Sequence, residues 1–194
     1  PSWFYHAEED SRVKSVHELW DIYCTSVGHN SVLLLNFPPD RRGLIHPTDS
    51  LHAALLKQGV DETFKTNLLA KAKIKATNVR GAKFGPERMV DGEKETYFAG
   101  KDKEVKADIV FTLPEKIEFD CLMIQEVIEL GHRTTKWSVE YSDDGRNWIS
   151  IPEATDKQAI GHKWIVRFAP VKAKQVRLRI LDGKACPAIH TFGV

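Results

Sequence analysis

The sequence predicts two fold classes in one chain, an α/β part over residues 1–70 and an all-β antiparallel sandwich or jelly roll over residues 73–194. The first prediction rests on a continuous apolar run at residues 32–35, which lies between two helical patterns. Such a run is typical of a parallel strand that helices cover on both faces. The second rests on a change of the apolar periodicity to two, with turn signals between the alternating segments.

Length and charge limit the classes of function. At 194 residues the chain is long enough for one domain or two small ones. Its formal net charge is +1 and no basic run stands out, so we expect no nucleic-acid partner. No apolar stretch approaches the length of a membrane-spanning helix, so we expect no membrane partner either. The three cysteines lack the spacing of metal ligands.

A first helix is expected to begin after Ser15. Ser15 and Glu18 have the spacing of a capping box, in which each side chain bonds the backbone N–H of the other residue. The apolar residues that follow fall on one helix face: Val16, Leu19, Trp20, Tyr23 and Val27. Gly28 is the expected end of this helix.

The stretch from Ser31 to Gly43, SVLLLNFPPDRRG, holds the expected buried strand. Two prolines end the strand because they withdraw backbone donors. Asp40, Arg41 and Arg42 then form a charged exit loop. An α/β fold places its ligand site at this end of a parallel strand. Alternatively, these three charged residues form ion pairs that only stabilise the loop, and the sequence fits this interpretation as well as a ligand site.

A second helix is expected to start at residues 47–50. Its apolar positions are Leu51, Leu55, Leu56, Val60, Phe64 and Leu68, and Gly59 weakens the middle of the pattern, so that one helix or two can form. One buried strand between helices cannot make a stable sheet alone. We therefore expect residues 1–70 to be the tail of a larger domain whose other strands lie outside this chain.

The second part alternates apolar and polar residues in short segments, at 109–111, 137–141, 164–168 and 176–180. Turn signals separate them at Asp91-Gly92, Asp143-Asp144-Gly145 and Asp182-Gly183. The boundary between the two parts is expected near residues 71–75.

Longer motifs cover essentially the whole chain. They read SWFYHAEED at 2–10, VKSVHELWDIYCTSVGHNSVLLLNFPPDRRGLI at 13–45, DETFKTNLLAKAKIKATNVRG at 61–81, MVDGEKETYFA at 89–99, IQEVIELGHRTTKWSVEY at 124–141 and ACPAIHTFGV at 185–194. Together they resemble the C-terminal part of a glycoside hydrolase family 29 α-L-fucosidase. The resemblance implies the end of a catalytic (β/α)8 barrel over residues 1–70, incomplete in this chain. A discoidin-like (factor 5/8 C-type) β-sandwich over residues 73–194 is implied to follow.

The implied activity is that of a retaining exo-α-L-fucosidase acting on terminal α-1,3- and α-1,4-linked L-fucose. Such enzymes use an aspartate nucleophile and a second carboxylate as acid and base. Both come from earlier barrel strands, and no residue here matches either motif. We therefore expect no catalytic residue in this chain and no activity from the chain alone. The implied partners are a fucosylated oligosaccharide or glycoconjugate and the remaining barrel polypeptide, and the implied location is periplasmic or secreted.

Two residues near the start are implied to bind substrate. Trp3 matches a family position whose aromatic ring lies against the apolar face and methyl group of fucose. His6 is a candidate hydrogen-bonding partner of the sugar. Plain packing is the alternative for both residues. Glu8 and Glu9 form a carboxylate pair, but adjacent carboxylates in a polar loop are usually solvated, and the family pattern does not make them catalytic.

In the sandwich, the resemblance implies a structural calcium at Asp91 and Thr96, since a hard cation binds carboxylate, hydroxyl and carbonyl oxygens. The family usually adds a glutamate from the last strand, whereas this chain has Ile189-His190-Thr191 there. Asp91-Gly92 is equally explained as a turn. No other cofactor is expected.

The role of the sandwich has two interpretations. Tyr97, Phe98, His132, Arg133, His162 and Trp164 are residue types that bind sugars, but the ELGHRTTKW run equally suits a domain that docks on the barrel. The alternative function for the whole chain is a non-catalytic carbohydrate-binding module of the lectin or adhesion type. The first 45 residues favour the enzyme, because a free-standing binding module has no need of them.

Overall fold

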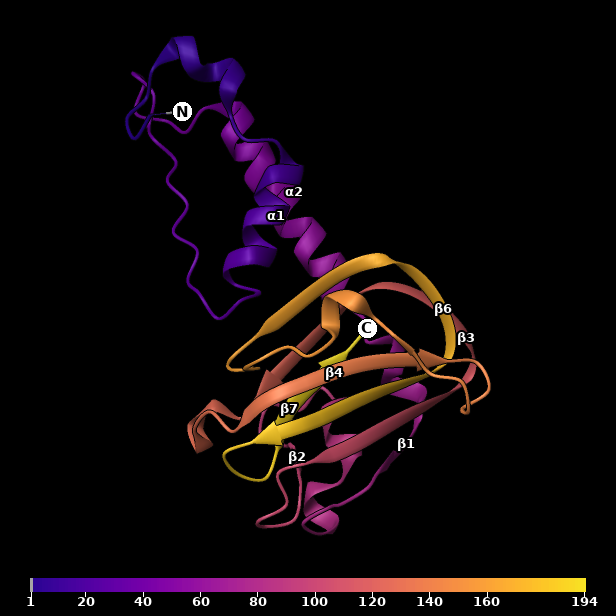
Figure 1. The fold of residues 1–194 in the computed structure, drawn as a ribbon. Coiled ribbons are helices and arrows are strands. Elements are labelled where there is room, and N and C mark those ends of the chain that lie inside the picture. Colours follow the sequence, from indigo (N-terminus) through magenta and orange to yellow (C-terminus); the bar gives the residue numbers. More distant parts are fainter. Residues whose placement is uncertain (1) are drawn as a thin grey trace. The chain divides into compact units, whose positions relative to one another are not determined.

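The computed structural model describes residues 2–194 and divides into two compact units. Among the described residues, the first unit comprises 2–27 and 31–66, and the second comprises 28–30 and 67–194. Figure 1 shows helices in the first unit and strands in the second. Within the part of the chain that the structure describes, no helix combines the length and apolarity of a membrane span.

Two α-helices dominate the first unit. α1 spans Val16–Ser26 and begins with the predicted capping box, in which Ser15 Oγ accepts from the Glu18 N–H at 3.2 Å and the Ser15 N–H donates to Glu18 Oε2 at 2.7 Å. α2 spans Pro47–Phe64 and runs through Gly59 without a break, so one helix forms rather than two. Trp20 of α1 stacks on Phe64 of α2 with ring centroids 6.4 Å apart. A 3-10 helix, Ala7–Arg12, precedes α1.

The end of α1 differs in one detail from the prediction. Val27 caps the helix with an α-helical backbone, and the left-handed conformation falls on Asn30, with φ of 66°, rather than on Gly28. Asparagine tolerates this region because its short side chain bonds locally.

The predicted strand at residues 32–35 is wrong for this chain. Residues 31–38 belong to no helix and to no strand ladder, and Val32 and Leu34 are 93% and 84% exposed. A strand exists only through hydrogen bonds to neighbouring strands, and the described residues of the first unit supply none. The end of an α/β barrel is accordingly not evident in this chain.

The first unit also exposes much apolar surface. No residue of α2 is buried, and α1 buries only Leu19 and Cys24. The large apolar side chains left exposed in this unit are Trp3, Phe4, Val32, Leu34, Leu44, Ile45, Leu51 and Leu55. A soluble monomer of this size rarely exposes so much large apolar surface in one unit without a binding partner.

The second unit is an antiparallel β-sandwich, as predicted. Its strands are β1 (Lys73–Ala76), β2 (Phe98–Ala99), β3 (Ala107–Glu126), β4 (Thr134–Ser142), β5 (Ile149–Ser150), β6 (Trp164–Gly183) and β7 (Ala188–Gly193). They follow the order β2-β7-β3-β6-β4-β5, with β1 also pairing with β3. All named pairings are antiparallel.

Two strands of 20 residues build both layers of the sandwich. The first half of β3 pairs with β1 and with the second half of β6, whereas its second half pairs with β7 and with the first half of β6. Register shifts between Thr112 and Ile117 and between Phe119 and Cys121 mark the bend. Figure 1 shows the curvature of both ribbons. The segments 164–168 and 176–180 are thus one strand.

The core lies between these layers. Alternate residues of β3 are buried over its first seven positions, and the largest fully buried side chains include Trp137, Phe98, Phe111, Phe192 and Leu69. Trp137 meets Trp164 edge to face, with centroids 6.5 Å apart. Burial of this apolar surface is the main stabilising contribution.

Residues 28–30 complete the second unit at the start of β6. The Gly28 carbonyl accepts from the Ile165 N–H at 2.8 Å, and the Asn30 N–H donates to the Lys163 carbonyl at 3.2 Å. His29 stacks on Trp164 with centroids 4.6 Å apart. These residues precede β1 by more than forty positions, so the second unit draws on a distant part of the chain.

Candidate functional site

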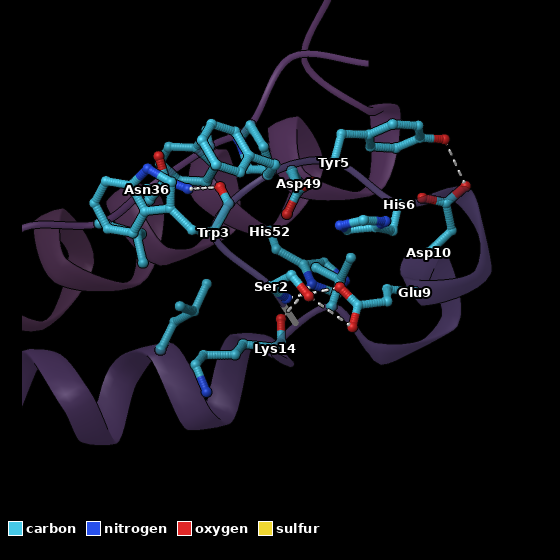
Figure 2. Close-up of a pocket in the computed structure, with 16 residues that line it drawn as sticks. Ser2, Trp3, Tyr5, His6, Glu9, Asp10, Lys14, Asn36, Asp49 and His52 are labelled. Atoms are coloured by element: carbon cyan, nitrogen blue, oxygen red, sulfur yellow. Dashed lines mark hydrogen bonds between the residues drawn. The ribbon is translucent and has the colours of Figure 1, made fainter. Parts of the chain in front are cut away.

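A cavity of about 250 Å³ lies within the first unit. Its lining comes from residues 2–6, the 3-10 helix, the segment 35–38 and the starts of both α-helices. This volume lies just below the range of pockets for drug-sized ligands and suits a small molecule. Figure 2 shows the side chains around it.

Both predicted substrate-binding residues line this cavity. Trp3 is 64% exposed, and its carbonyl accepts from Asn36 Nδ2 at 2.7 Å. His6 is exposed, with Nδ1 3.7 Å from Glu8 Oε1. The cavity therefore offers an exposed indole and a nearby imidazole, which suit the apolar and polar sides of a sugar ring.

Tyr5, Asp10 and His52 also line the cavity, and His46 contacts Asp10 from outside this lining. The Tyr5 hydroxyl donates to Asp10 Oδ2 at 3.1 Å, and His46 Nε2 lies 3.5 Å from the same oxygen. Burial and the Asp10 hydrogen bond raise the pKa of Tyr5. His52 Nδ1 lies 2.7 Å from the Lys14 carbonyl. These contacts order the polar wall of the cavity.

The two adjacent glutamates have different roles. Glu8 is exposed, as expected of a solvated carboxylate. Glu9 instead accepts from the Ser2 N–H at 2.6 Å and from the Ser2 hydroxyl at 3.2 Å. The Ser2 N–H bond lowers the pKa of Glu9, so Glu9 is an acceptor rather than a proton donor at neutral pH. Sequence reasoning missed this role.

For the charged loop, the structure favours ion pairing over a ligand site. Asp40 is buried and accepts from Arg42 Nε at 2.9 Å and from the Arg42 N–H at 2.8 Å. These bonds from Arg42 lower the pKa of Asp40. Gly43 closes the turn with φ of 76°, and Arg41 is exposed. None of these residues lines the cavity.

The structure brings the Asp91 and Thr96 side chains together, and they hydrogen-bond to each other. Thr96 Oγ1 donates to Asp91 Oδ2 at 2.8 Å, the Glu93 N–H donates to Asp91 Oδ1 at 2.9 Å, and Arg88 Nη1 lies 3.5 Å from Oδ2. This arrangement is an Asx-type turn, and the positively charged Arg88 guanidinium lies beside its carboxylate. His190 Nε2 also lies 2.9 Å from the Lys94 carbonyl. Each Asp91 oxygen thus accepts from a donor of the protein, and within the described residues no group of three or more His, Cys, Asp or Glu side chains gathers that could hold a metal ion.

The sandwich residues of sugar-binding type have separate partners. Phe98 is fully buried, Tyr97 packs against Phe84, and Trp164 lies between His29 and Trp137. His132 Nδ1 lies 3.2 Å from Glu126 Oε2, and Arg133 Nη1 donates to the Cys186 carbonyl at 3.2 Å. The contacts of these residues are those of a structural framework.

Glu126 is a structural residue of this framework that the sequence did not reveal. It is 3% exposed and accepts from the N–H groups of Thr134, Arg133 and Gly161 at 2.6, 3.3 and 3.2 Å. A buried carboxylate persists where several donors satisfy it. Glu126 therefore holds the 131–134 and 161 loops together.

Comparison with known proteins assigns both parts of the chain. Residues 73–191 match the F5/8 type C domain family. Across all of this chain, a rice (Oryza sativa subsp. japonica) protein provisionally named alpha-L-fucosidase 1 is 33% identical and Alpha-L-fucosidase 1 of Arabidopsis thaliana is 28% identical. The chain spans 37% and 38% of the length of these two relatives.

Solved structures agree with this assignment. A Bacteroides thetaiotaomicron protein provisionally assigned as an alpha-L-fucosidase matches all of the chain with 87% identity and a TM-score of 0.99, over 42% of its own length. A Ruminococcus gnavus glycoside hydrolase family 29 fucosidase in complex with fucose matches all of the chain with 32% identity and a TM-score of 0.90, over 39% of its length. The chain thus belongs to the F5/8 type C domain family over residues 73–191, and its whole length matches the C-terminal part of alpha-L-fucosidases.

Proposed function

We propose that this chain is the C-terminal part of a retaining exo-α-L-fucosidase that removes terminal α-1,3- and α-1,4-linked L-fucose from glycans. The observation that carries the proposal is the small cavity walled by Trp3 and His6, in a chain that is similar over its whole length to fucosidases. In this proposal the Trp3 indole contacts the fucose methyl, and His6 bonds a ring hydroxyl. The ligand is a fucosylated oligosaccharide or glycoconjugate.

The exposed apolar surface of the first unit supports its place in a larger barrel. We propose that residues 1–70 complete a (β/α)8 barrel whose remaining strands pair with the segment at 32–35 and cover Val32 and Leu34. The partner of this surface is the remaining barrel polypeptide. In the proposal the sandwich is an accessory or docking domain, since its framework contacts suit packing.

The chain alone is expected to be inactive. Hydrolysis with retention needs a nucleophile and an acid/base carboxylate about 5 Å apart, and the proposal places both upstream of Pro1. We expect no release of nitrophenol when the purified 194-residue chain is incubated with 4-nitrophenyl α-L-fucoside. Turnover by a preparation whose intact mass shows only this chain would contradict the proposal.

Replacement of Trp3 tests the cavity as the sugar site. In the complete enzyme, Trp3→Ala should lower kcat/KM for an aryl α-L-fucoside by about 10- to 200-fold, because an apolar contact of this kind contributes about 1–3 kcal/mol to transition-state binding. Thermal melts of the same samples are the control. An unchanged kcat/KM would remove Trp3 from the site.

A carbohydrate-binding sandwich is the second candidate function. Its supporting observation is the match of residues 73–191 to the F5/8 type C domain family. Calorimetric titration of the chain with fucosylated oligosaccharides tests it, and the absence of binding heat at millimolar ligand would exclude it. The resemblance to fucosidases also supports a periplasmic or secreted location, which fractionation of producing cells tests.

A further inference from the structure

We propose that Glu9 and Asn36 are positioning residues for Trp3, and that they set the preference of the enzyme for a methyl group on the sugar. This inference rests on the proposed function, because it deepens the role of the same cavity. Neither residue needs to touch the substrate. Asn36 holds the peptide group that follows Trp3, and Glu9 holds Ser2, the residue before it.

The first restraint lies before Trp3. Glu9 accepts from both the Ser2 N–H and the Ser2 hydroxyl, at 2.6 and 3.2 Å. Its side chain is only 16% exposed, and Arg12 Nη1 lies 3.4 Å from Oε1. The Glu9 N–H also donates to the His6 carbonyl at 2.9 Å. The Glu9 carboxylate is therefore held in place by contacts with His6 and Arg12, and it restrains Ser2, the residue that precedes Trp3.

The second restraint lies after Trp3. Asn36 donates from Nδ2 to the Trp3 carbonyl at 2.7 Å, a contact that joins residues 33 positions apart. Asn36 follows the apolar run at 32–35 directly. Figure 2 draws the Ser2–Glu9 and Trp3–Asn36 hydrogen bonds as dashed lines.

The consequence follows from the exposure of Trp3. A side chain that is 64% exposed is held less by packing than by its backbone. With Ser2 held by Glu9 and the Trp3 carbonyl held by Asn36, the backbone at Trp3 is restrained, and this sets the Cα–Cβ direction along which the indole extends. Preorganisation of this kind matters because a misplacement of about 1 Å can cost about 100-fold in rate.

The test compares two substrates on one preparation. In the complete enzyme, kcat/KM is measured for an aryl α-L-fucoside and for the matching aryl α-L-galactoside, which carries a hydroxymethyl group where fucose has its methyl. Where galactoside turnover is too slow, the inhibition constants of L-fucose and L-galactose replace the two values. The ratio is independent of the fraction of active enzyme, so loss of folded protein cannot mimic the effect.

We expect Trp3→Ala to reduce the fucoside preference most, and Glu9→Ala and Asn36→Ala to reduce it by about 10-fold each, within the range for one misplaced apolar contact. Glu9→Gln should restore most of the preference, because its amide oxygen still accepts from the Ser2 N–H. Asn36→Asp should not, because its carboxylate faces the Trp3 carbonyl as a second acceptor. Glu62→Ala, an exposed carboxylate in α2, is the control and should leave the ratio unchanged.

The outcomes separate the two proposals. If Trp3→Ala lowers the ratio and the Glu9 and Asn36 variants leave it unchanged, this inference is overturned and the proposed function stands. If Trp3→Ala also leaves the ratio unchanged, Trp3 does not contact the fucose methyl group. The assignment of the cavity to that group and this inference are then both wrong. If the complete wild-type enzyme hydrolyses no fucoside, the proposed function itself fails.

Discussion

Single carboxylates organise several loops of this protein. Asp144 is an example in the sandwich: Oδ1 accepts from the N–H groups of Arg146 and Asn147, each at 2.8 Å, and Oδ2 accepts from Asn147 Nδ2 at 2.7 Å. These bonds lower the pKa of Asp144 to about 2, and the bond from the Asn147 N–H contributes most. The turn after β4 therefore depends on an ionised aspartate.

This pKa makes the stability of the turn depend on pH in a defined direction. The folded-state pKa lies below the ordinary value of 3.8, so the contribution of Asp144 is fully present above that value and is lost as the pH falls towards about 2. We expect Asp144→Asn to lower the urea midpoint of the chain at pH 5 and to approach the wild type near pH 2.

The control for this experiment is Asp143→Asn, whose carboxylate pairs with the exposed Lys116 at 2.6 Å. An exposed pair of this kind contributes little to stability. If the difference between Asp144→Asn and wild type is the same at pH 5 and pH 2, the ionised carboxylate is not what holds the turn.

At the scale of elements, β6 depends on a segment from far away in the sequence. Asn30 donates from Nδ2 to the Ile160 carbonyl at 2.9 Å and accepts through Oδ1 from the Lys163 N–H at 3.0 Å. Together with the backbone bonds of Gly28 and Asn30, these contacts satisfy the groups that precede the strand. Residues 28–30 therefore act as an extra edge of the sandwich.

Substitution of Asn30 measures what this edge contributes. Asn30→Gly keeps the positive φ of this position and removes both side-chain bonds. We expect the free energy of unfolding of the second unit to fall by about 1–3 kcal/mol, because the Lys163 N–H and the Ile160 carbonyl lose their partners. Urea unfolding followed by tryptophan fluorescence gives the value, and no change would mean that water replaces the side chain without cost.

At the scale of the whole molecule, we expect the second unit to fold on its own and the first unit not to. The second unit has its own core, to which Leu69 contributes while fully buried. Leu68 donates its N–H to the Val194 carbonyl, and Asn67 donates from Nδ2 to the Phe192 carbonyl at 2.9 Å. A fragment of residues 67–194 should fold cooperatively, whereas one starting at residue 71 should be less stable by about 2–5 kcal/mol because it loses Leu69.

The first unit should lack this independence. Its helices carry apolar residues that the described chain leaves exposed, and short helices owe most of their stability to packing. In the monomeric 194-residue chain, we expect the amides of residues 33–35 to exchange rapidly with solvent. Strong protection there, in a sample with no second polypeptide, would contradict the assignment of this segment to an incomplete barrel.

Part of this structure could be predicted from local sequence. The period-two segments specify antiparallel strands because alternate side chains of a strand face opposite sides, and Ser15 with Glu18 specifies the start of α1 because a capping box needs only one turn of chain. Trp3 and His6 were implied as site residues by family resemblance. The structure places both at one cavity, and the kinetic tests above decide their role.

Tertiary structure decided the features that depend on residues far apart in the chain. The apolar run at 32–35 has the composition of a buried strand, yet it forms none here because a strand needs hydrogen-bonded neighbours. The continuity of β3 and β6 through both layers and the edge formed by residues 28–30 arise from pairing that no local period records. The role of Asn36 was missed for the same reason, because the Trp3–Asn36 contact spans 33 positions. Local patterns determine which segments can be helix or strand, whereas the partners of each segment follow from the packing of the whole chain.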